Sequence, residues 1–152
     1  HRDLHSFPTR RSSDLQIEDS GHVHAVDNDT KAIELTKKNL AKFGVGNVSI
    51  INKDANKAIS DLPEADAIFI GGTGKDTKEI VKLCQDKLKQ GGRIVIGMIL
   101  IETIFSVLSL IQELSFNSVD ITQVTISKSR KTSTGTMMLA RNPVTILSAT
   151  KN

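Results

Sequence analysis

The chain has 152 residues, 38% of them hydrophobic, which suits a single domain with an aliphatic core that includes five Phe but no Trp or Tyr. The formal net charge of +3 is modest, and the basic residues are scattered instead of clustered, which argues against a nucleic-acid-binding protein. No apolar run approaches the ~18 residues of a membrane-spanning helix. The single cysteine, Cys84, excludes an internal disulfide and fits a cytoplasmic location.

The first fifteen residues do not share the pattern of the rest of the chain. They have neither helical nor strand periodicity, and they lack the apolar middle region of a signal peptide. The stretch resembles a translated sequencing adapter, and a disordered native tail rich in Arg and Ser is the alternative. We therefore expect a non-native tail over residues 1–15 and a single domain over residues 16–152.

The rest of the chain alternates between short apolar strands and amphipathic helices. Asn28, Asp29 and Thr30 supply an N-cap for the first helix, and Gly44 suits the position just after its end. Strands that alternate with helices in this way are typical of a parallel sheet in an α/β fold. The predicted strands are 22–26, 48–52, 66–70 and 93–98, and the helices that follow them are 30–43, 56–62, 76–88 and 102–114.

The last part of the chain contains strands without helices between them. Strands are predicted over 119–127 and 136–140, with a charged loop over 128–135 and a short extension over 144–147. Such a pair indicates an antiparallel hairpin at the edge of the sheet. Gln90-Gly91-Gly92 is interpreted as a turn. Cys84, Met137 and Met138 are expected in the core, although the two methionines could instead cover an apolar ligand.

Three features follow successive predicted strands. The first strand ends at Asp27, the second in Asp54-Ala55, and the third, an apolar run expected to be buried on both faces, in Gly71-Gly72-Thr73-Gly74. In an open parallel sheet, ligands bind beyond the carboxyl ends of the strands. An acid there can accept hydrogen bonds from ribose hydroxyls or a base amine, and glycines let backbone approach a ligand. The alternatives are helix caps for the acids and a flexible loop for the glycines.

The sequence resembles the class I S-adenosylmethionine-dependent methyltransferases. Within them it is similar to the decarboxylating precorrin C15-methyltransferases of cobalamin biosynthesis, the methyltransferase-fold half of the precorrin-6Y C5,15-methyltransferase system. The resemblance runs from about residue 16 to the end of the chain. It rests on motifs at 23–29, 32–35, 39–40, 43–44, 54–55, 71–74, 88–93, 101–103, 129–131, 135–138 and 142–144.

The resemblance implies a Rossmann-like seven-stranded sheet in the order 3-2-1-4-5-7-6, with strand 7 antiparallel. Members of this class carry a first strand and a glycine-rich turn of the type D-x-G-x-G-x-G upstream of the position of residue 16. Residues 1–15 stand in their place here, so we expect a truncated methyltransferase domain that binds S-adenosylmethionine poorly as the 152-residue chain.

The resemblance also implies roles for particular residues. Asp27 would bind the ribose of S-adenosylmethionine, and Asp54 with Ala55 its adenine. Gly71, Gly72, Thr73 and Gly74 would face the reacting methionine end, with Gly71 also contacting the cofactor. The substrate carries many carboxylates, so Arg130 is a candidate to bind it, with ordinary exposed charge as the alternative. Glu102 and Thr103 follow a strand end and could reach the same cleft; the alternative is a favourable acid at a helix start. No metal site is predicted.

The implied reaction is methylation at C15 with loss of CO2 from the ring C acetate of a precorrin or cobalt-precorrin. The implied partners are the tetrapyrrole substrate, further copies of the chain in a homotetramer, and a C5-methyltransferase domain, either fused or separate. The sequence does not distinguish a cobalt-containing substrate from a metal-free one. The alternatives are a tRNA or other RNA methyltransferase, which would favour more aromatic residues, a nicotinamide-dependent oxidoreductase, and a non-catalytic subunit.

Overall fold

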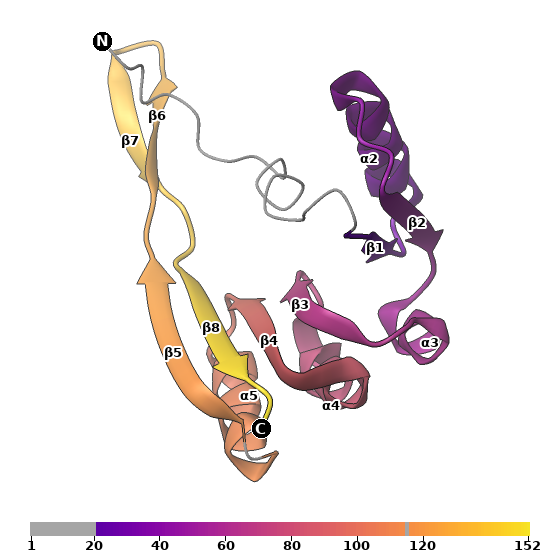
Figure 1. The fold of residues 1–152 in the computed structure, drawn as a ribbon. Helices are drawn as coiled ribbons and strands as arrows, with labels where there is room; N and C mark the ends of the chain where they lie inside the picture. Colours follow the sequence, from indigo (N-terminus) through magenta and orange to yellow (C-terminus); the bar gives the residue numbers. More distant parts are fainter. Residues whose placement is uncertain (1–20, 115) are drawn as a thin grey trace, which may run out of the picture. The chain divides into compact units, whose positions relative to one another are not determined.

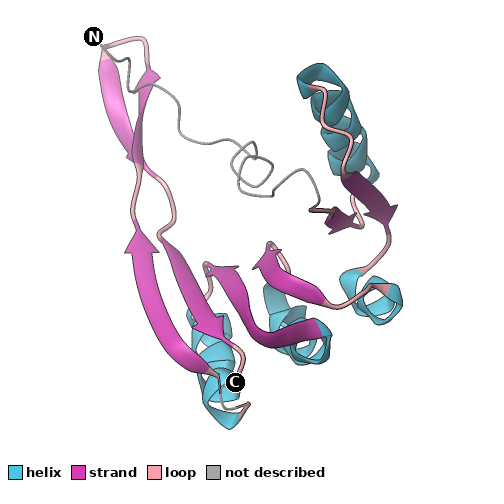
Figure 2. Cartoon of the chain, viewed as in Figure 1, coloured by secondary structure: helices cyan, strands magenta, loops and turns pink. Residues whose placement is uncertain are grey.

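The computed structural model describes residues 21–114 and 116–152. The chain divides into two units, one ending at Ala58 and the other beginning at Ile59, and each is described by itself. Figure 1 labels their elements, and Figure 2 distinguishes their helices from their strands. No helix in the described part of the chain is both long and apolar enough to cross a membrane.

The first unit is built on two parallel strands, β1 (Val23–Asp27) and β2 (Val48–Asn52). They are connected by α2 (Thr30–Phe43), and β2 is followed by the short α3 (Ala55–Ala58). The α2 helix begins as predicted, because the Asp29 side chain accepts a hydrogen bond from the Lys31 N–H at 2.9 Å. It ends at Gly44, whose φ of 66° is the left-handed conformation that glycine adopts easily.

The second unit is built on a four-stranded sheet in the order β3-β4-β8-β5. Strands β3 and β4 are parallel, and β8 is antiparallel to both of its neighbours. If β1 is the second strand of the expected class, then β3, β4, β8 and β5 are its strands 4, 5, 7 and 6. The observed order then agrees with the one that the resemblance implied, with strand 7 antiparallel. Similarly, β1 and β2 form the pair 2-3 in a separate sheet. The strands are β3 (Ala65–Gly71), β4 (Leu88–Met98), β5 (Asn117–Val124) and β8 (Val144–Thr150).

The core of the second unit lies between this sheet and two helices, α4 (Thr77–Lys87) and α5 (Ile101–Glu113), which lie on the same side of it in Figure 2. Strand side chains point alternately to the two faces, and every second residue is buried in β8 and in the second half of β4. The buried strand residues include Ile70, Leu88, Ile94, Ile96, Met98, Thr145, Leu147 and Ala149, and the helices contribute Thr77, Ile80, Val81, Cys84, Thr103, Val107, Leu110 and Ile111.

The prediction that β3 is buried on both faces is wrong for the described structure. Ile70 is buried, but Phe69, one residue earlier, is 76% exposed. A continuous apolar run carries no alternation, so it cannot reveal that helices cover only one of the two faces. Cys84 is in the core, as predicted, and its burial raises the pKa of its thiol to about 11.

The C-terminal part differs from the predicted edge hairpin. Residues predicted as a charged loop form β6 (Ser127–Lys131), which pairs with β7 (Thr136–Ala140), while β5 pairs with β8. The Arg141 N–H donates to the Ile126 carbonyl at 2.8 Å and links the two strand pairs, which follow one another in Figure 1. Strand β6 has no apolar face, so the sequence held no periodic signal for it.

Two further expectations in this region are corrected. The short extension predicted at 144–147 is the full strand β8, which lies between β4 and β5 and buries every second residue. Met137 and Met138 are not core residues, since they are 49% and 63% exposed on the two-stranded β6–β7 ribbon.

The predicted turn at Gln90-Gly91-Gly92 lies inside a strand. Strand β4 continues through it with a shift in register, since Ala65 pairs with Leu88 but Ala67 pairs with Arg93. The backbone of Lys151 bonds to this irregularity on both sides, from the Gly91 N–H at 3.0 Å and to the Gly92 carbonyl at 2.9 Å. Lys151, the residue that follows β8, therefore compensates for the interrupted pairing.

Replacing Gly92 with Ala should lower the free energy of unfolding by about 2 kcal/mol, the usual cost of overpacking. A Cβ at Gly92 would lie 2.8 Å from the Lys89 carbonyl oxygen and 2.9 Å from two atoms of Leu88. The matched control is Gly97→Ala in the same strand, where the nearest atom, the Ile70 carbonyl oxygen, is at 3.9 Å. Urea unfolding followed by circular dichroism measures both, and equal stability of the two variants would contradict this account.

Candidate functional site

The carboxylate of Asp27 lies at the end of β1 and is exposed. One of its oxygens, Oδ1, accepts a hydrogen bond from the Asp29 N–H at 2.9 Å, which orients the group at the strand end. The side chain that caps α2 belongs to Asp29, so the alternative role for Asp27 as the helix cap does not hold. A carboxylate has about four lone-pair positions, and Asp27 can therefore accept further hydrogen bonds from a ligand.

Asp54 follows β2 and is held beside the end of β1 by a residue that sequence reasoning did not select. The Asn28 Nδ2 donates to Asp54 Oδ1 at 2.8 Å. The Lys57 ammonium lies 3.8 Å from Asp54 Oδ2, but both side chains are more than half exposed, so this ion pair contributes little. The position of Asn28 directly after Asp27 was the only sequence signal for its role.

Ala55 supplies a donor next to these acceptors. It is the first residue of α3, where a backbone N–H has no acceptor within the helix. The first hydrogen bonds of this helix are donated by the N–H groups of Lys57 and Ala58, which both bond to the Asp54 carbonyl at 3.0 Å. Because β1 and β2 are parallel and Asp27 pairs with Asn52, these groups lie together at the carboxyl ends of the two strands. A carboxylate beside an N–H donor suits a ring nitrogen with a neighbouring exocyclic amine.

The glycine loop, Gly71–Gly74, follows β3 in the second unit. Gly72 and Gly74 have φ of 69° and 55°, values that residues with a Cβ rarely adopt. The hydroxyls of Thr73 and Thr77 are 2.6 Å apart, and Thr77 Oγ1 donates to the Gly74 carbonyl at 2.6 Å. The loop is therefore held by side-chain hydrogen bonds and is not simply a flexible connection.

The three predicted substrate residues have different surroundings. Glu102 is exposed in the first turn of α5, which follows β4, the parallel neighbour of β3. Since Gly71 pairs with Gly97, the glycine loop and the start of α5 lie at the same edge of the sheet. Thr103 is only 9% exposed, so its side chain packs inside. Arg130 is exposed on β6, opposite Met137, and belongs to the separate ribbon.

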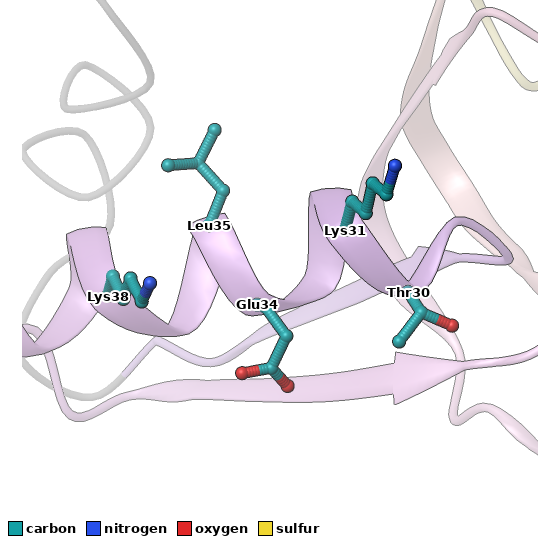
Figure 3. A pocket seen from close by; sticks show the side chains of 5 residues that line it. All are labelled: Thr30, Lys31, Glu34, Leu35 and Lys38. Atoms are coloured by element: carbon teal, nitrogen blue, oxygen red, sulfur yellow. The ribbon is translucent and has the colours of Figure 1, made fainter.

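A surface hollow in the first unit does not coincide with these residues. Figure 3 shows it along the exposed side of α2, and none of the predicted site residues lines it. All of its lining residues come from this one helix, so it is a shallow groove between neighbouring side chains. They are Thr30, Lys31, Glu34, Leu35 and Lys38.

Residues 15–151 match the precorrin methyltransferase domain family. A protein of Saccharolobus solfataricus named "probable cobalt-precorrin-6B C(15)-methyltransferase (decarboxylating)" is 42% identical over 139 residues, which are 90% of this chain and 70% of that protein. A similarly named protein of Sulfurisphaera tokodaii is 44% identical over 134 residues, 88% of this chain and 69% of the relative.

Solved structures agree with these sequence relatives. The precorrin 8W decarboxylase of Methanobacterium thermoautotrophicum is 39% identical with a TM-score of 0.73, covering 84% of this chain and 69% of that structure. The precorrin-6Y C5,15-methyltransferase of Geobacter metallireducens is 28% identical with a TM-score of 0.74, covering 86% and 68%. The fold is the α/β fold of the Rossmann-like class I methyltransferases. The chain therefore belongs to the precorrin methyltransferase domain family.

Proposed function

We propose that the protein methylates C15 of cobalt-precorrin-6B, or of its metal-free counterpart, and removes CO2 from the ring C acetate, in cobalamin biosynthesis. The observation that carries this proposal is the 42% identity to a relative named for this reaction, over 90% of the chain. The acidic strand ends Asp27 and Asp54 support it from the structure, because they place acceptors where this class of fold binds its cofactor.

The proposed cofactor is S-adenosylmethionine, and the groups at the ends of β1 and β2 fit it. Asp27 has acceptor capacity for ribose hydroxyls, while Asp54 and the Ala55 N–H form the acceptor and donor that an adenine edge requires. When bound, S-adenosylmethionine supplies a methyl group activated by its sulfonium. Gly71 and its neighbours in the loop let backbone approach the reacting end, since a Cβ would obstruct it.

Methyl transfer requires alignment more than acid–base chemistry. An in-line displacement needs the donor and the substrate carbon held close together with water excluded, and a conjugated tetrapyrrole carbon is already nucleophilic. The macrocycle can also take up the electrons released when the acetate carboxylate leaves as CO2. The proposed part of Arg130 is to bind a carboxylate at the edge of the substrate, and Glu102, with Thr103 behind it, would contact the same molecule.

The other functions considered have less support. An RNA methyltransferase shares the fold, but the tRNA methyltransferase structure from Aquifex aeolicus is only 18% identical, a level that carries the fold alone. An acid in the position of Asp27, at the end of β1, also serves nicotinamide cofactors. The Asp54 carboxylate beside the Ala55 N–H favours instead an adenine held as in methyltransferases. A non-catalytic subunit would neither transfer methyl groups nor release CO2, so measuring both distinguishes it from an enzyme.

We also propose that residues 1–15 are foreign to the domain. The family match begins at residue 15, which is where the adapter-like stretch ends. The genomic sequence upstream of the Gln16 codon tests this proposal, and it should encode a strand followed by a glycine-rich turn. We further propose that a C5-methylating domain, fused or separate, acts with the protein, because related structures carry the name C5,15-methyltransferase.

The function is tested with this chain and with a version extended by the N-terminal segment of the Saccharolobus solfataricus relative. The extended protein should transfer methyl groups from S-adenosylmethionine to cobalt-precorrin-6B and release CO2, measured by mass spectrometry and trapping of labelled CO2. The Asp27→Asn variant should bind S-adenosylmethionine about tenfold more weakly, because a charged hydrogen-bond acceptor is lost. Asp86→Asn, an exposed change on α4, is the matched control. Absence of methylation by the folded extended protein refutes the function.

The substrate role of Arg130 has its own test. Replacing Arg130 with Ala should raise the KM for the tetrapyrrole about tenfold and leave the affinity for S-adenosylmethionine unchanged, since a charge-assisted hydrogen bond to a carboxylate is removed. Ser129→Ala, at the neighbouring exposed position of β6, is the control. Unchanged steady-state kinetics of the Arg130 variant would count against this role.

We propose that the protein is a homo-oligomer, a tetramer, assembled through the β6–β7 ribbon and the edge strand β5 that precedes it. Exposed apolar side chains gather along these strands, and such a concentration is typical of an interaction surface. Neither α4 nor α5 covers the β6–β7 pair, which forms a sheet of its own. The exposed apolar residues are Val119, Ile121, Val124, Ile126, Met137 and Met138.

A charge on this ribbon should separate the copies. Met138→Lys should shift the extended protein from tetramer to smaller species in light scattering after size exclusion, because an unpaired ammonium would be buried at the interface. Thr134→Lys, in the turn between β6 and β7, adds the same charge at an exposed site and should leave the assembly intact. Assembly of the Met138 variant equal to that of the control would contradict the proposed interface.

A further inference from the structure

A chain of two hydroxyls connects the glycine loop to the helix that follows it. Thr77, the first residue of α4, donates from Oγ1 to the Gly74 carbonyl at 2.6 Å. Its oxygen also lies 2.6 Å from Thr73 Oγ1. Thr77 is only 3% exposed, whereas Thr73 is half-buried at the surface of the loop. The inner hydroxyl therefore contacts two of the loop's residues without itself being accessible to a ligand.

The proton positions of the two hydroxyls follow from the last acceptor in the series, the Gly74 carbonyl. A carbonyl oxygen can only accept, so the single proton of the Thr77 hydroxyl is directed to Gly74. Thr73 must then donate its own proton to Thr77, which leaves lone pairs on Thr73 Oγ1 toward its exposed side. In this arrangement, Thr73 accepts hydrogen bonds from a ligand and does not donate to it.

Thr77, the inner member of the hydroxyl pair, is held rigidly because α4 packs into the core. Ile80, Val81 and Cys84 follow Thr77 on the same helix, and all are buried. The loop itself contains two glycines with positive φ, which have many accessible conformations when unconstrained. Hydrogen bonds from a buried, fixed residue to such a loop select one of these conformations.

We propose that Thr77 is a positioning residue, which holds Gly71–Gly74 in the conformation used for methyl transfer and presents Thr73 as a hydrogen-bond acceptor. The inference rests on the proposed function, because it takes the glycine loop to face the reacting groups. It goes beyond that function by assigning catalytic geometry to a side chain that touches neither cofactor nor substrate.

The first test measures the loop directly and does not depend on activity. The Asp76 N–H donates to the Thr73 carbonyl at 3.3 Å, so its exchange with solvent reports the loop conformation. Thr77→Val, which keeps the shape but not the hydroxyl, should speed this exchange about fivefold in NMR experiments. Thr77→Ser keeps the hydroxyl and should exchange at the original rate. The Lys31 N–H in the first unit, bonded to Asp29, serves as the reference.

The second test measures turnover in the N-terminally extended protein. Thr77→Val should lower kcat by roughly tenfold with little change in either KM, because misplacement of a loop raises the barrier without removing a binding contact. Thr77→Ser should restore kcat, which a merely structural loss would not predict. Full turnover by Thr77→Val overturns the proposal, whether or not the Asp76 exchange changes.

Failure of the proposed function and failure of this inference give different results. If the unsubstituted protein methylates no precorrin, the function fails, and the exchange rates alone then decide whether Thr77 fixes the loop. If Thr77→Val does not fold, Thr73→Val removes the outer hydroxyl at a half-buried position and takes its place. Faster Asp76 exchange with reduced kcat in that variant supports the inference, and unchanged values overturn it.

Discussion

The packing of α4 and α5 against one face of the four-stranded sheet is the constraint on which the rest of the second unit depends. Apolar burial is the main favourable term in folding, and here it is concentrated on one layer of alternating residues, among them Ile94, Ile96 and Leu147. This layer fixes the register of β4 and β8, because a shift of one residue would expose every buried side chain. It also fixes the direction of α4, and with it the place of the glycine loop.

The candidate site groups at the strand ends are held in two different ways. Each group lies where a parallel strand ends, as Asp27 does in the first unit and Gly71 in the second. Asp27 is oriented by the backbone N–H of Asp29, two residues later, whereas Asp54 is oriented by the side chain of Asn28, which lies 26 residues away in sequence. The glycine loop depends instead on a buried helix start. The protein thus combines locally ordered acceptors with a loop that is held from the core.

Much of the fold could be predicted because its periodicities are strong. The cap at Asp29, the end of α2 at Gly44 and the order of strands and helices as far as α5 all follow from local patterns and are confirmed. The predictions failed where local pattern and tertiary context differ. Strand β6 has no apolar face to reveal it, and the glycines at 91–92 indicated a turn although the Lys151 backbone holds them within β4. The role of Asn28 depends on Asp54, 26 residues later in the chain, and that of Thr77 depends on its burial and on the conformation of the glycine loop, so local pattern did not reveal either role.

The sequence by itself determined the family, the α/β class and the residues at the strand ends, because these depend on motifs and on contacts between residues close in the chain. It did not determine which face of β3 is covered, which strand pairs with β5, or what orients Asp54 and the glycine loop. Those features depend on residues far apart in sequence, such as Asp120 and Ser148 in the β5–β8 pair, or on burial that helices impose. Only the tertiary structure decides them, because the free energy that selects among the alternatives comes from packing and not from local preference.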